Sequence, residues 1–449
     1  MGLGEMGHGS AGLLIPFCAI EIFICIYMVR HYFFTLNRLF GGQRHPLVDI
    51  DIADWPAVTV LVAAHNEETV IGDVLECLLQ VDYPPDRLHI VPVNDRSTDG
   101  TEAIIDAIAA RNPGRITPFH RRGGKARKAA ALQEAMENYV QTEIVLLFDA
   151  DYMPGKPLIR QLVAPFFDPE VGCVMGRVVP VNVSHNLLTR MLEMERAAGY
   201  QIDQQARQNL RLVPQFGGTA GGMRKSALFE AGGWNTDTLT EDTDLTFRLM
   251  LCGWKTVYQN RAECYEESPV RWPVRVRQNK RWAKGHNQVM WKYSLSLVRR
   301  CCLTPRERID GLLLLWIYAM APALLIAWLL AVTMFYNGYY LQGPMLVLFV
   351  ASFTAMGNFA TFFEIAASAR LDGARERMLI LPFNFLGFLV SIMTCSQAVF
   401  ELVREAILRS DAKWDKTERA RQAAPRPAPE LVPESIPSEA PGEAVREAA

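Results

Sequence analysis

The sequence lacks an excess of charge of either sign. Its 449 residues hold 46 lysines and arginines against 48 aspartates and glutamates, for a net charge of −2. Proteins that bind nucleic acid usually carry a basic surface, so this balance argues against a nucleic-acid partner. The nine cysteines are odd in number and form no CxxC pair, which argues against a disulfide framework or a zinc ribbon. We interpret them as reduced, structural thiols.

Hydrophobic residues make up 50% of the chain and charged residues 21%. This is too apolar for an ordinary soluble enzyme and too charged for a pure membrane bundle, so we expect a soluble domain with membrane spans. At roughly 150 residues per domain, the length allows two or three units.

The first apolar run, residues 11–34, is long enough for a membrane helix, which needs about 20 residues. A signal peptide would place positive charge before its apolar core, whereas Arg30, Arg38 and Arg44 follow this one. We therefore expect a retained anchor. By the positive-inside tendency, its N-terminus lies outside and the chain from about residue 38 onward lies in the cytoplasm.

Three later apolar runs, at 311–336, 343–366 and 378–403, predict a C-terminal membrane region over 311–403. Four simple crossings would leave the basic tail outside, against the positive-inside tendency. The third of these runs contains Pro382 and Gly387 and can begin as an interfacial or re-entrant piece, so the side of the C-terminus stays open. Residues 404–449 form a basic and then a Pro-, Ala- and Glu-rich tail, whose second part is expected to be disordered.

Between the membrane segments, short apolar runs at 58–64, 88–93 and 143–148 are each followed by polar residues. Helical stretches separate them, which predicts the alternating pattern of a parallel sheet. Ligands bind beyond the carboxyl ends of such strands, where Asp95, Asp149 and Asp151 fall.

The DAD sequence places Asp149 and Asp151 two residues apart at a strand end. Oxygen ligands in that arrangement suit Mg²⁺ or Mn²⁺ together with a substrate phosphate, although a solvated turn looks the same in sequence. Asp95, in VNDRSTDGT, either contacts a nucleotide base or belongs to a cluster that caps the following helix.

Two further motifs follow downstream. Thr240, Glu241 and Asp242 form TED at a predicted helix start, where acidic residues commonly complement the helix dipole; for Asp244 we keep that ordinary explanation. QNKRW at 278–282 lies in an Arg- and Trp-rich segment over 266–310, which also has the composition of an interfacial helix.

In this order, the motifs resemble the signature D, DxD, TED and QxxRW of the processive family-2 glycosyltransferases, the group of cellulose, chitin, hyaluronan and poly-N-acetylglucosamine synthases. The resemblance covers residues 57–300. It implies a cytoplasmic catalytic domain over 57–265 with an α/β GT-A (Rossmann-like) fold, flanked by transmembrane helices. It also implies Mg²⁺ or Mn²⁺ bound through Asp149 and Asp151.

The resemblance implies roles for the other motif residues. Asp242, with Glu241 beside it, would remove the acceptor proton, and attack opposite the leaving group would invert the anomeric centre. The nucleotide sugar, most simply a UDP-sugar, would contact Asp95, Glu67, Lys125, Asp149, Gln278 and Arg281. Lys128 is read more simply as solvated surface. The acceptor would contact Trp282, Gly218, Thr219 and Thr240.

The implied function is polymerisation and export of a β-linked polysaccharide, poly-N-acetylglucosamine-like first and glucan- or chitin-type second. The few membrane helices leave open whether an accessory subunit or a second copy completes a pore. A non-processive polyprenyl-phosphate glycosyltransferase and a silent carbohydrate-binding membrane protein are the alternatives. Neither the sugar nor a UDP or GDP donor follows from these motifs, because pocket shape sets that selectivity.

Overall fold

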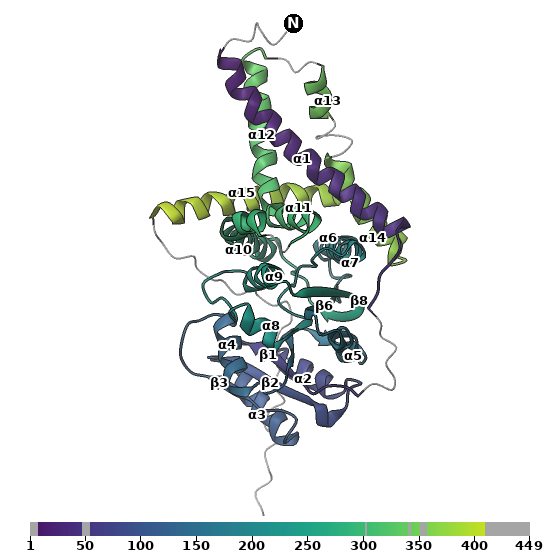
Figure 1. Ribbon diagram of the computed structural model, residues 1–449, viewed down its shortest axis with the longest axis vertical. Helices are drawn as coiled ribbons and strands as arrows, with labels where there is room; N and C mark the ends of the chain where they lie inside the picture. The colour runs from purple at the N-terminus through teal and green to yellow at the C-terminus, as the bar shows by residue number, and fades with distance from the viewer. Residues whose placement is uncertain (1–7, 47–53, 301–302, 340–342, 351–356, 409–449) are drawn as a thin grey trace, which may run out of the picture.

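The computed structural model describes residues 8–46, 54–300, 303–339, 343–350 and 357–408. An α/β body forms the lower part of the molecule and a helical stalk rises from it (Figure 1). The chain enters through the stalk, builds the body, and returns to the stalk.

One mixed sheet of eight strands organises the body, with the order β3-β2-β1-β4-β7-β6-β8-β5. β1 pairs in parallel with β2 and β4, whereas β7 runs antiparallel to both β4 and β6. The pairing of Ala64 with Asn94 and of Ala63 with Asp149 brings the ends of three strands to one edge. The bounds are β1 Val58–Ala64, β2 Leu88–Asp95, β3 Phe119–Arg121, β4 Ile144–Asp149, β5 Met153–Pro154, β6 Val171–Pro180, β7 Gly221–Arg224 and β8 Lys255–Glu266.

The central strands are apolar along their whole length because both faces of the sheet are covered by helices. Their side chains join those of the flanking helices in one hydrophobic core. These helices are α2 Ile71–Leu79, α3 Thr101–Arg111, α4 Lys128–Tyr139, α5 Leu158–Val163 and α8 Lys225–Glu230.

A layer of helices separates the sheet from the stalk (Figure 1). Gly285 of α10 lies so close to α9 that an added Cβ would be 2.5 Å from the Thr240 side chain, which fixes the two helices at van der Waals distance. The layer consists of α6 Leu187–Ala197, the π-helix Ala198–Gln204, α7 Gln205–Leu210, α9 Glu241–Cys252, α10 Trp272–Arg299 and α11 Pro305–Leu315.

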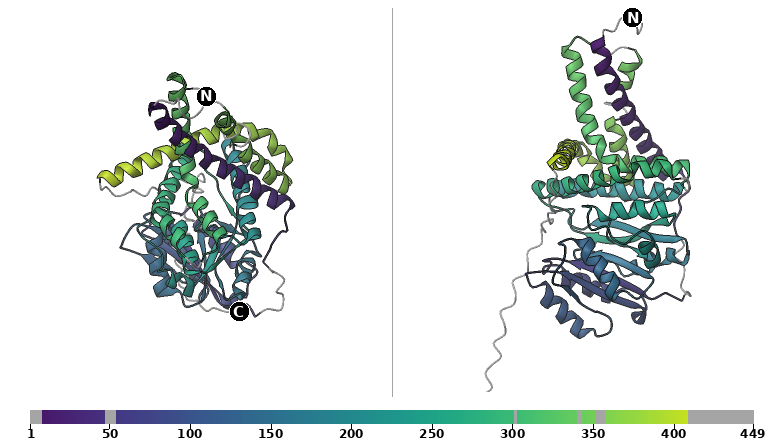
Figure 2. Two further views of the ribbon diagram at one scale, coloured as in Figure 1. Left: turned by 45° about the horizontal axis from the view of Figure 1, so that its top comes forward. Right: turned by 60° about the vertical axis from the view of Figure 1, so that its left-hand side comes forward.

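The stalk rises on two steep helices, α1 His8–Phe40 and α12 Met320–Tyr336. α15, Asn384–Leu408, lies crosswise at their base, and the turned view shows it nearly end-on (Figure 2). Within the described residues, three segments are long and apolar enough to cross a membrane: Gly12–Phe40, Ile317–Tyr336 and Arg375–Leu408. The predicted run 343–366 contains α13 Pro344–Val350 and part of α14 Gly357–Leu371, and its residues 351–356 lie outside the described ranges.

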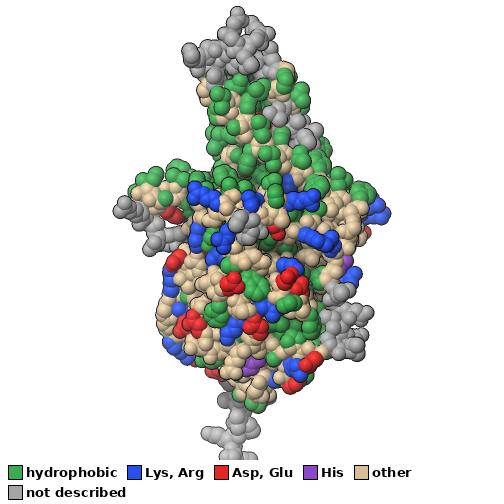
Figure 3. Space-filling view, in the orientation of Figure 1, with side chains coloured by type: hydrophobic (Ala, Val, Ile, Leu, Met, Phe, Trp, Pro, Cys, Tyr) green, Lys and Arg blue, Asp and Glu red, His purple; other side chains and the backbone are tan. Residues whose placement is uncertain are grey.

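Buried ion pairs hold the stalk on the body. Arg30 of α1 contacts Asp203 at 2.7 Å, and Arg207 of α7 contacts Asp310 of α11 at 3.0 Å. Burying one partner alone would be costly, so the four charges fix the orientation of these elements. Above this level the visible surface is largely apolar, and a belt of lysines and arginines marks the junction (Figure 3).

Candidate active site

A single cavity of about 830 Å³ extends from the strand ends of the sheet up to the base of the stalk. Its lower part holds the motif residues of the sequence, and its upper part is lined by α12 and α15. Apart from Lys125, every candidate residue lines it: Glu67, Asp95, Asp149, Asp151, Gly218, Thr219, Thr240, Glu241, Asp242, Gln278, Arg281 and Trp282. The topology therefore brings the four motifs together.

The two aspartates of DAD lie on the floor of the cavity, where β4 ends. The backbone N–H of Asp149 donates to Thr219 Oγ1 at 3.0 Å. Lys128 Nζ lies 2.6 Å from Asp149 Oδ1 and donates to the carbonyl of Gly218 at 2.8 Å. Asp151 is buried beside this group. The floor thus combines two carboxylates with one cation, and it can hold a divalent metal and a diphosphate.

Asp242 stands at the start of α9, above the floor. The backbone N–H of Thr243 donates to its Oδ1 at 2.7 Å. Gly218 adopts φ +78, and a Cβ there would lie 3.2 Å from Asp242 Oδ2, so the glycine leaves room for this carboxylate. Burial, followed by the charge of Glu241, raises the pKa of Asp242 to about 6. A carboxyl with that pKa suits proton abstraction near neutral pH.

Asp244 lies two residues further along α9 and has a different environment. Its buried carboxylate accepts hydrogen bonds from Arg248 at 2.6 Å and from Lys292 and Tyr293, both at 3.0 Å. Burial alone would raise its pKa, but the charge of Arg248 and the hydrogen bonds from Asn235, Lys292 and Arg248 lower it. Asp244 therefore ties α9 to α10, a larger role than the dipole complementation expected from the sequence.

The QNKRW residues lie on α10, and all of them except Lys280 line the cavity. Arg281 Nε is buried and has no hydrogen-bond partner in the described part of the chain, so it is available to a ligand. The guanidinium carbons of Arg196 and Arg275 each lie 5.5 Å from the centre of the Trp282 ring. Arg275 in turn donates to Gln278 at 3.2 Å. The ring is thereby held in place by two cations.

Asp95 lines the cavity at the end of β2. Its carboxylate accepts from Arg96 Nε at 2.8 Å and from Arg121 Nη1 at 3.0 Å. The N-cap of α3 is Gly100, and next to it Asp99, not Asp95, accepts from the backbone N–H of Thr101 at 3.0 Å. The contact of Asp95 with a nucleotide stays a prediction.

The structure reverses the environments that the sequence predicted for the two lysines near the cavity. Lys125 is about half exposed, pairs with Asp237, and does not line the cavity. Lys128, predicted to be solvated surface, contacts Asp149 and does line it. The physical reason is that Lys128 opens α4, which packs against the sheet, whereas Lys125 precedes the helix in a surface loop.

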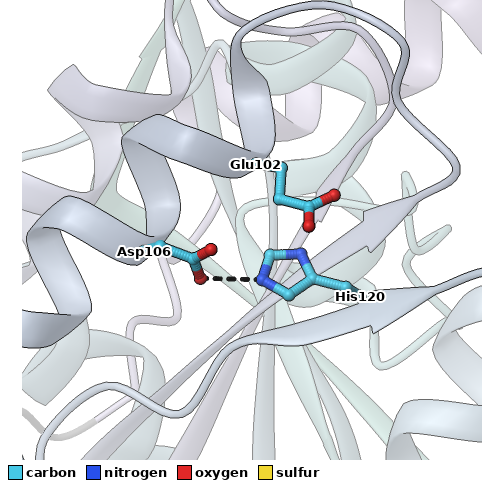
Figure 4. Close-up of side chains that lie close together, drawn as sticks. All are labelled: Glu102, Asp106 and His120. Atoms are coloured by element: carbon cyan, nitrogen blue, oxygen red, sulfur yellow. Dashed lines mark hydrogen bonds and ion pairs between the residues drawn. The ribbon is translucent and has the colours of Figure 1, made fainter.

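Glu102, Asp106 and His120 form a separate group that could ligate a metal by distance (Figure 4). It lies on α3 and β3, outside the cavity lining. His120 Nε2 is 2.9 Å from Asp106, and Glu102 pairs with Arg122.

The sequence did not predict a group of three interacting side chains in the cavity wall. The Tyr152 hydroxyl contacts Glu266, and Arg196 lies 2.6 Å from the same carboxylate. Glu266 ends β8 much as Asp95 ends β2, and this common position was the available signal. Nothing local in the sequence marks Tyr152 or Arg196.

Comparison with known proteins adds a family. Residues 56–285, just over half of the chain, match the model of the family described as "Glycosyltransferase like family 2". A probable glycosyltransferase of Bacillus subtilis is 26% identical over 430 residues, covering 90% of this chain and 97% of that protein. A β-monoglucosyldiacylglycerol synthase of Synechocystis is 34% identical over 244 residues, covering 54% of this chain and 50% of that protein.

Glucomannan 4-β-mannosyltransferase 7 of Arabidopsis thaliana is 31% identical over 259 residues. The match covers 56% of this chain and 46% of the plant protein, so the chain spans about half the length of this relative. Among solved structures, a mannosyltransferase of Pyrobaculum calidifontis in complex with GDP-Man and Mn²⁺ aligns with a TM-score of 0.55 at 22% identity. It covers 80% of this chain and 97% of that one, and it supports a GT-A-like fold.

Proposed function

The chain belongs to glycosyltransferase family 2, enzymes that use nucleotide sugars, and from this we propose that it is a membrane-bound, inverting and processive synthase of a β-linked polysaccharide. One observation carries the proposal: a single cavity joins the DAD, TED and QxxRW residues and continues to the apolar stalk. Donor and acceptor can therefore meet at Asp242 from opposite ends.

The donor would lie at the strand ends. Asp95 and Glu67 would contact the nucleoside. Lys128 and Arg281 would contact the diphosphate, and Gln278 would form part of the polar wall of the site. The unpartnered Arg281 Nε supports a phosphate oxygen as its ligand. Asp149 and Asp151 fit Mg²⁺ or Mn²⁺, because hard cations take carboxylate and phosphate oxygens. The bound metal would supply Lewis-acid stabilisation of the leaving diphosphate.

The transfer itself would depend on Asp242. Its carboxylate would accept the proton of the acceptor hydroxyl while the hydroxyl oxygen attacks the anomeric carbon. Attack opposite the leaving group inverts that centre and yields a β-linkage from an α-linked donor. Glu241 would keep the pKa of Asp242 raised through its charge, which supports the role of base near neutral pH.

The acceptor would occupy the space between Asp242 and the stalk, against Trp282, Gly218, Thr219 and Thr240. Repeated transfer to the growing end would give the polymer. The apolar surface of α1, α12 and α15 supports insertion in a bilayer with the body on the cytoplasmic side, and product exit along the stalk. We place poly-N-acetylglucosamine first and a glucan or chitin-type polymer second, and the names of the Arabidopsis and Pyrobaculum proteins add mannose to the donors to be tested.

The test is nucleotide release and product size from the full chain in nanodiscs. The donors are UDP-N-acetylglucosamine, UDP-glucose and GDP-mannose, each with Mg²⁺ or Mn²⁺. We expect one donor to yield high-mass β-linked glycan, and Asp242→Asn to lose the product. Asp237→Asn is the matched control, because it makes the same change on a carboxylate outside the cavity. A product of one sugar on polyprenyl phosphate would replace the synthase by the non-processive alternative.

A further inference from the structure

The upper part of the cavity is an apolar arm. It is defined by lining residues on three elements at the base of the stalk: the turn Ile317–Ala319, α12 and α15. Most of the side chains that line it are hydrophobic, among them Ile317, Met320, Ala321, Leu324, Phe388 and Ile392. The cavity is therefore lined by carboxylates at its lower end and by apolar side chains at its upper end.

Three polar groups at the margin of the arm, Tyr27, His31 and Ser391, are engaged within the protein. The Tyr27 hydroxyl donates to the carbonyl of Leu313 at 2.5 Å, and His31 pairs with Glu364. Ser391 Oγ accepts from Asn279 at 3.5 Å. A bare glycan has hydroxyls around every ring, and burying them without partners is costly. An alkyl chain carries no such groups and gains from apolar burial, so it fits this lining better.

The arm reaches the residues around the transfer site. Ala283, which follows Trp282 in α10, packs against Cys395 and Ala398 of α15. Tyr318 and Ala321 pack against the same group. A molecule whose hydroxyl lies at Asp242 can thus extend past Trp282 into hydrocarbon surroundings.

The outer faces of the same helices are apolar as well. Leu329, Val332 and Phe335 on α12 and Phe400 and Ile407 on α15 are each more than half exposed. Helices with such faces lie in or on a bilayer, which is where alkyl chains are found. A molecule that occupies the arm would therefore come from the bilayer.

We propose that the first sugar acceptor is a membrane lipid with a neutral alcohol headgroup, whose alkyl chain lies in the apolar arm while its hydroxyl meets Asp242. This inference rests on the proposed transferase function and names its acceptor class. The lipid oxygen forms the bond to the anomeric carbon, the bond from that carbon to the diphosphate breaks, the proton goes to Asp242, and nucleoside diphosphate leaves. A lipid phosphate would not need a base for this step, which is why the alcohol is the acceptor chosen.

The experiment uses the full chain in phosphatidylcholine nanodiscs with or without dioleoylglycerol, and the three donors carry labelled sugar. We expect label in the lipid extract only with dioleoylglycerol. Ala321→Phe and Leu324→Trp, which fill the arm, should lower it at least tenfold. Leu329→Trp, on the exposed face of the same helix, should not change it. Calorimetric binding of the nucleoside diphosphate with Mn²⁺ shows that each variant is folded.

Three outcomes would overturn the inference. Water-soluble polymer made equally well without dioleoylglycerol, and unaffected by filling the arm, would remove the lipid acceptor and leave the synthase standing. Labelling only of added polyprenyl phosphate would exclude the neutral alcohol. No nucleotide release from any donor with any acceptor would refute the transferase itself, and the acceptor with it.

Discussion

The two ends of the cavity are built by different means. At the floor, charged residues follow the ends of β2 and β4 and are held by hydrogen bonds, as Asp149 is by Thr219 and Lys128. In the apolar arm, helices meet through packed side chains such as Leu324 and Ile392. Hydrogen bonds at the floor hold individual side-chain atoms in defined positions, as a reaction requires. Packing in the apolar arm determines only the shape of the space. Changes at the floor should therefore alter rate, and changes above it should alter what is made.

Removing the divalent metal should have the largest effect. Both carboxylates of DAD line the floor, and a diphosphate leaving group needs its charge neutralised. We expect chelation by EDTA to abolish nucleotide release, and Mn²⁺ or Mg²⁺ to restore it. Asp151→Asn should require more metal for half-maximal rate, measured by titration. Full activity in EDTA would show that the floor works through Lys128 and Arg281 alone.

Asp242→Asn should lower the turnover rate by about 10²- to 10⁴-fold, the usual contribution of a general base. The amide keeps the shape but cannot take a proton, so nucleotide affinity should hardly change. Turnover and calorimetric binding are the two readouts. In contrast, Asp244→Ala should act on stability, because it leaves Arg248 and Lys292 without their carboxylate. If both variants lost turnover equally and were equally stable, the assignment of Asp242 as the base and of Asp244 as a structural residue would be wrong.

The rate should fall on the acid side with an apparent pKa near 6. Asp242 must be deprotonated to act, and burial raises its pKa to about 6, so protonation removes the base as pH falls through that value. At pH 5 about a tenth of the carboxylate would remain ionised, whereas an ordinary aspartate with a pKa of about 3.9 would stay ionised. The check is initial nucleotide release from pH 4.5 to 8. A flat profile down to pH 5 contradicts the assignment.

Trp282→Ala should have the smallest effect on rate and should instead shorten the product. The ring lines the same cavity as Asp242 and the apolar arm, and there it would hold the acceptor between additions. Gel filtration of the labelled glycan measures this change. Trp291→Ala, also on α10 but largely exposed and outside the cavity lining, is the control. Unchanged chain length in Trp282→Ala would remove the acceptor role.

Much of the floor could be predicted from sequence because parallel strands bring their carboxyl ends to one edge. Runs such as 58–64 and 143–148 became β1 and β4, and Asp95, Asp149 and Asp151 lie where that rule placed them. The contacts between distant residues could not be predicted. Tyr152 and Glu266 are 114 positions apart, and no local pattern records their meeting.

The arrangement of the helices in the stalk could not be predicted from the sequence, for a different reason. Hydropathy counts apolar residues along the chain and is blind to the direction of a helix. The run 378–403 is as apolar as a membrane span, yet α15 packs along α10 and carries Glu401 on the side that pairs with Lys280 and Lys284. Only the three-dimensional contacts distinguish the two uses of such a helix.

The crosswise course of α15 suggests an answer to the open question of where the C-terminal tail lies. α1 descends from tip to base, α12 climbs back, and α13 lies toward the tip while α14 has returned to the base (Figure 1). If these three passages are the crossings, α15 lies level with α10, on the side of the α/β body (Figure 1). The basic sequence that follows then obeys the charge rule that four crossings would have broken. A protease site introduced after α15 should accordingly be cut from the catalytic side in sealed vesicles.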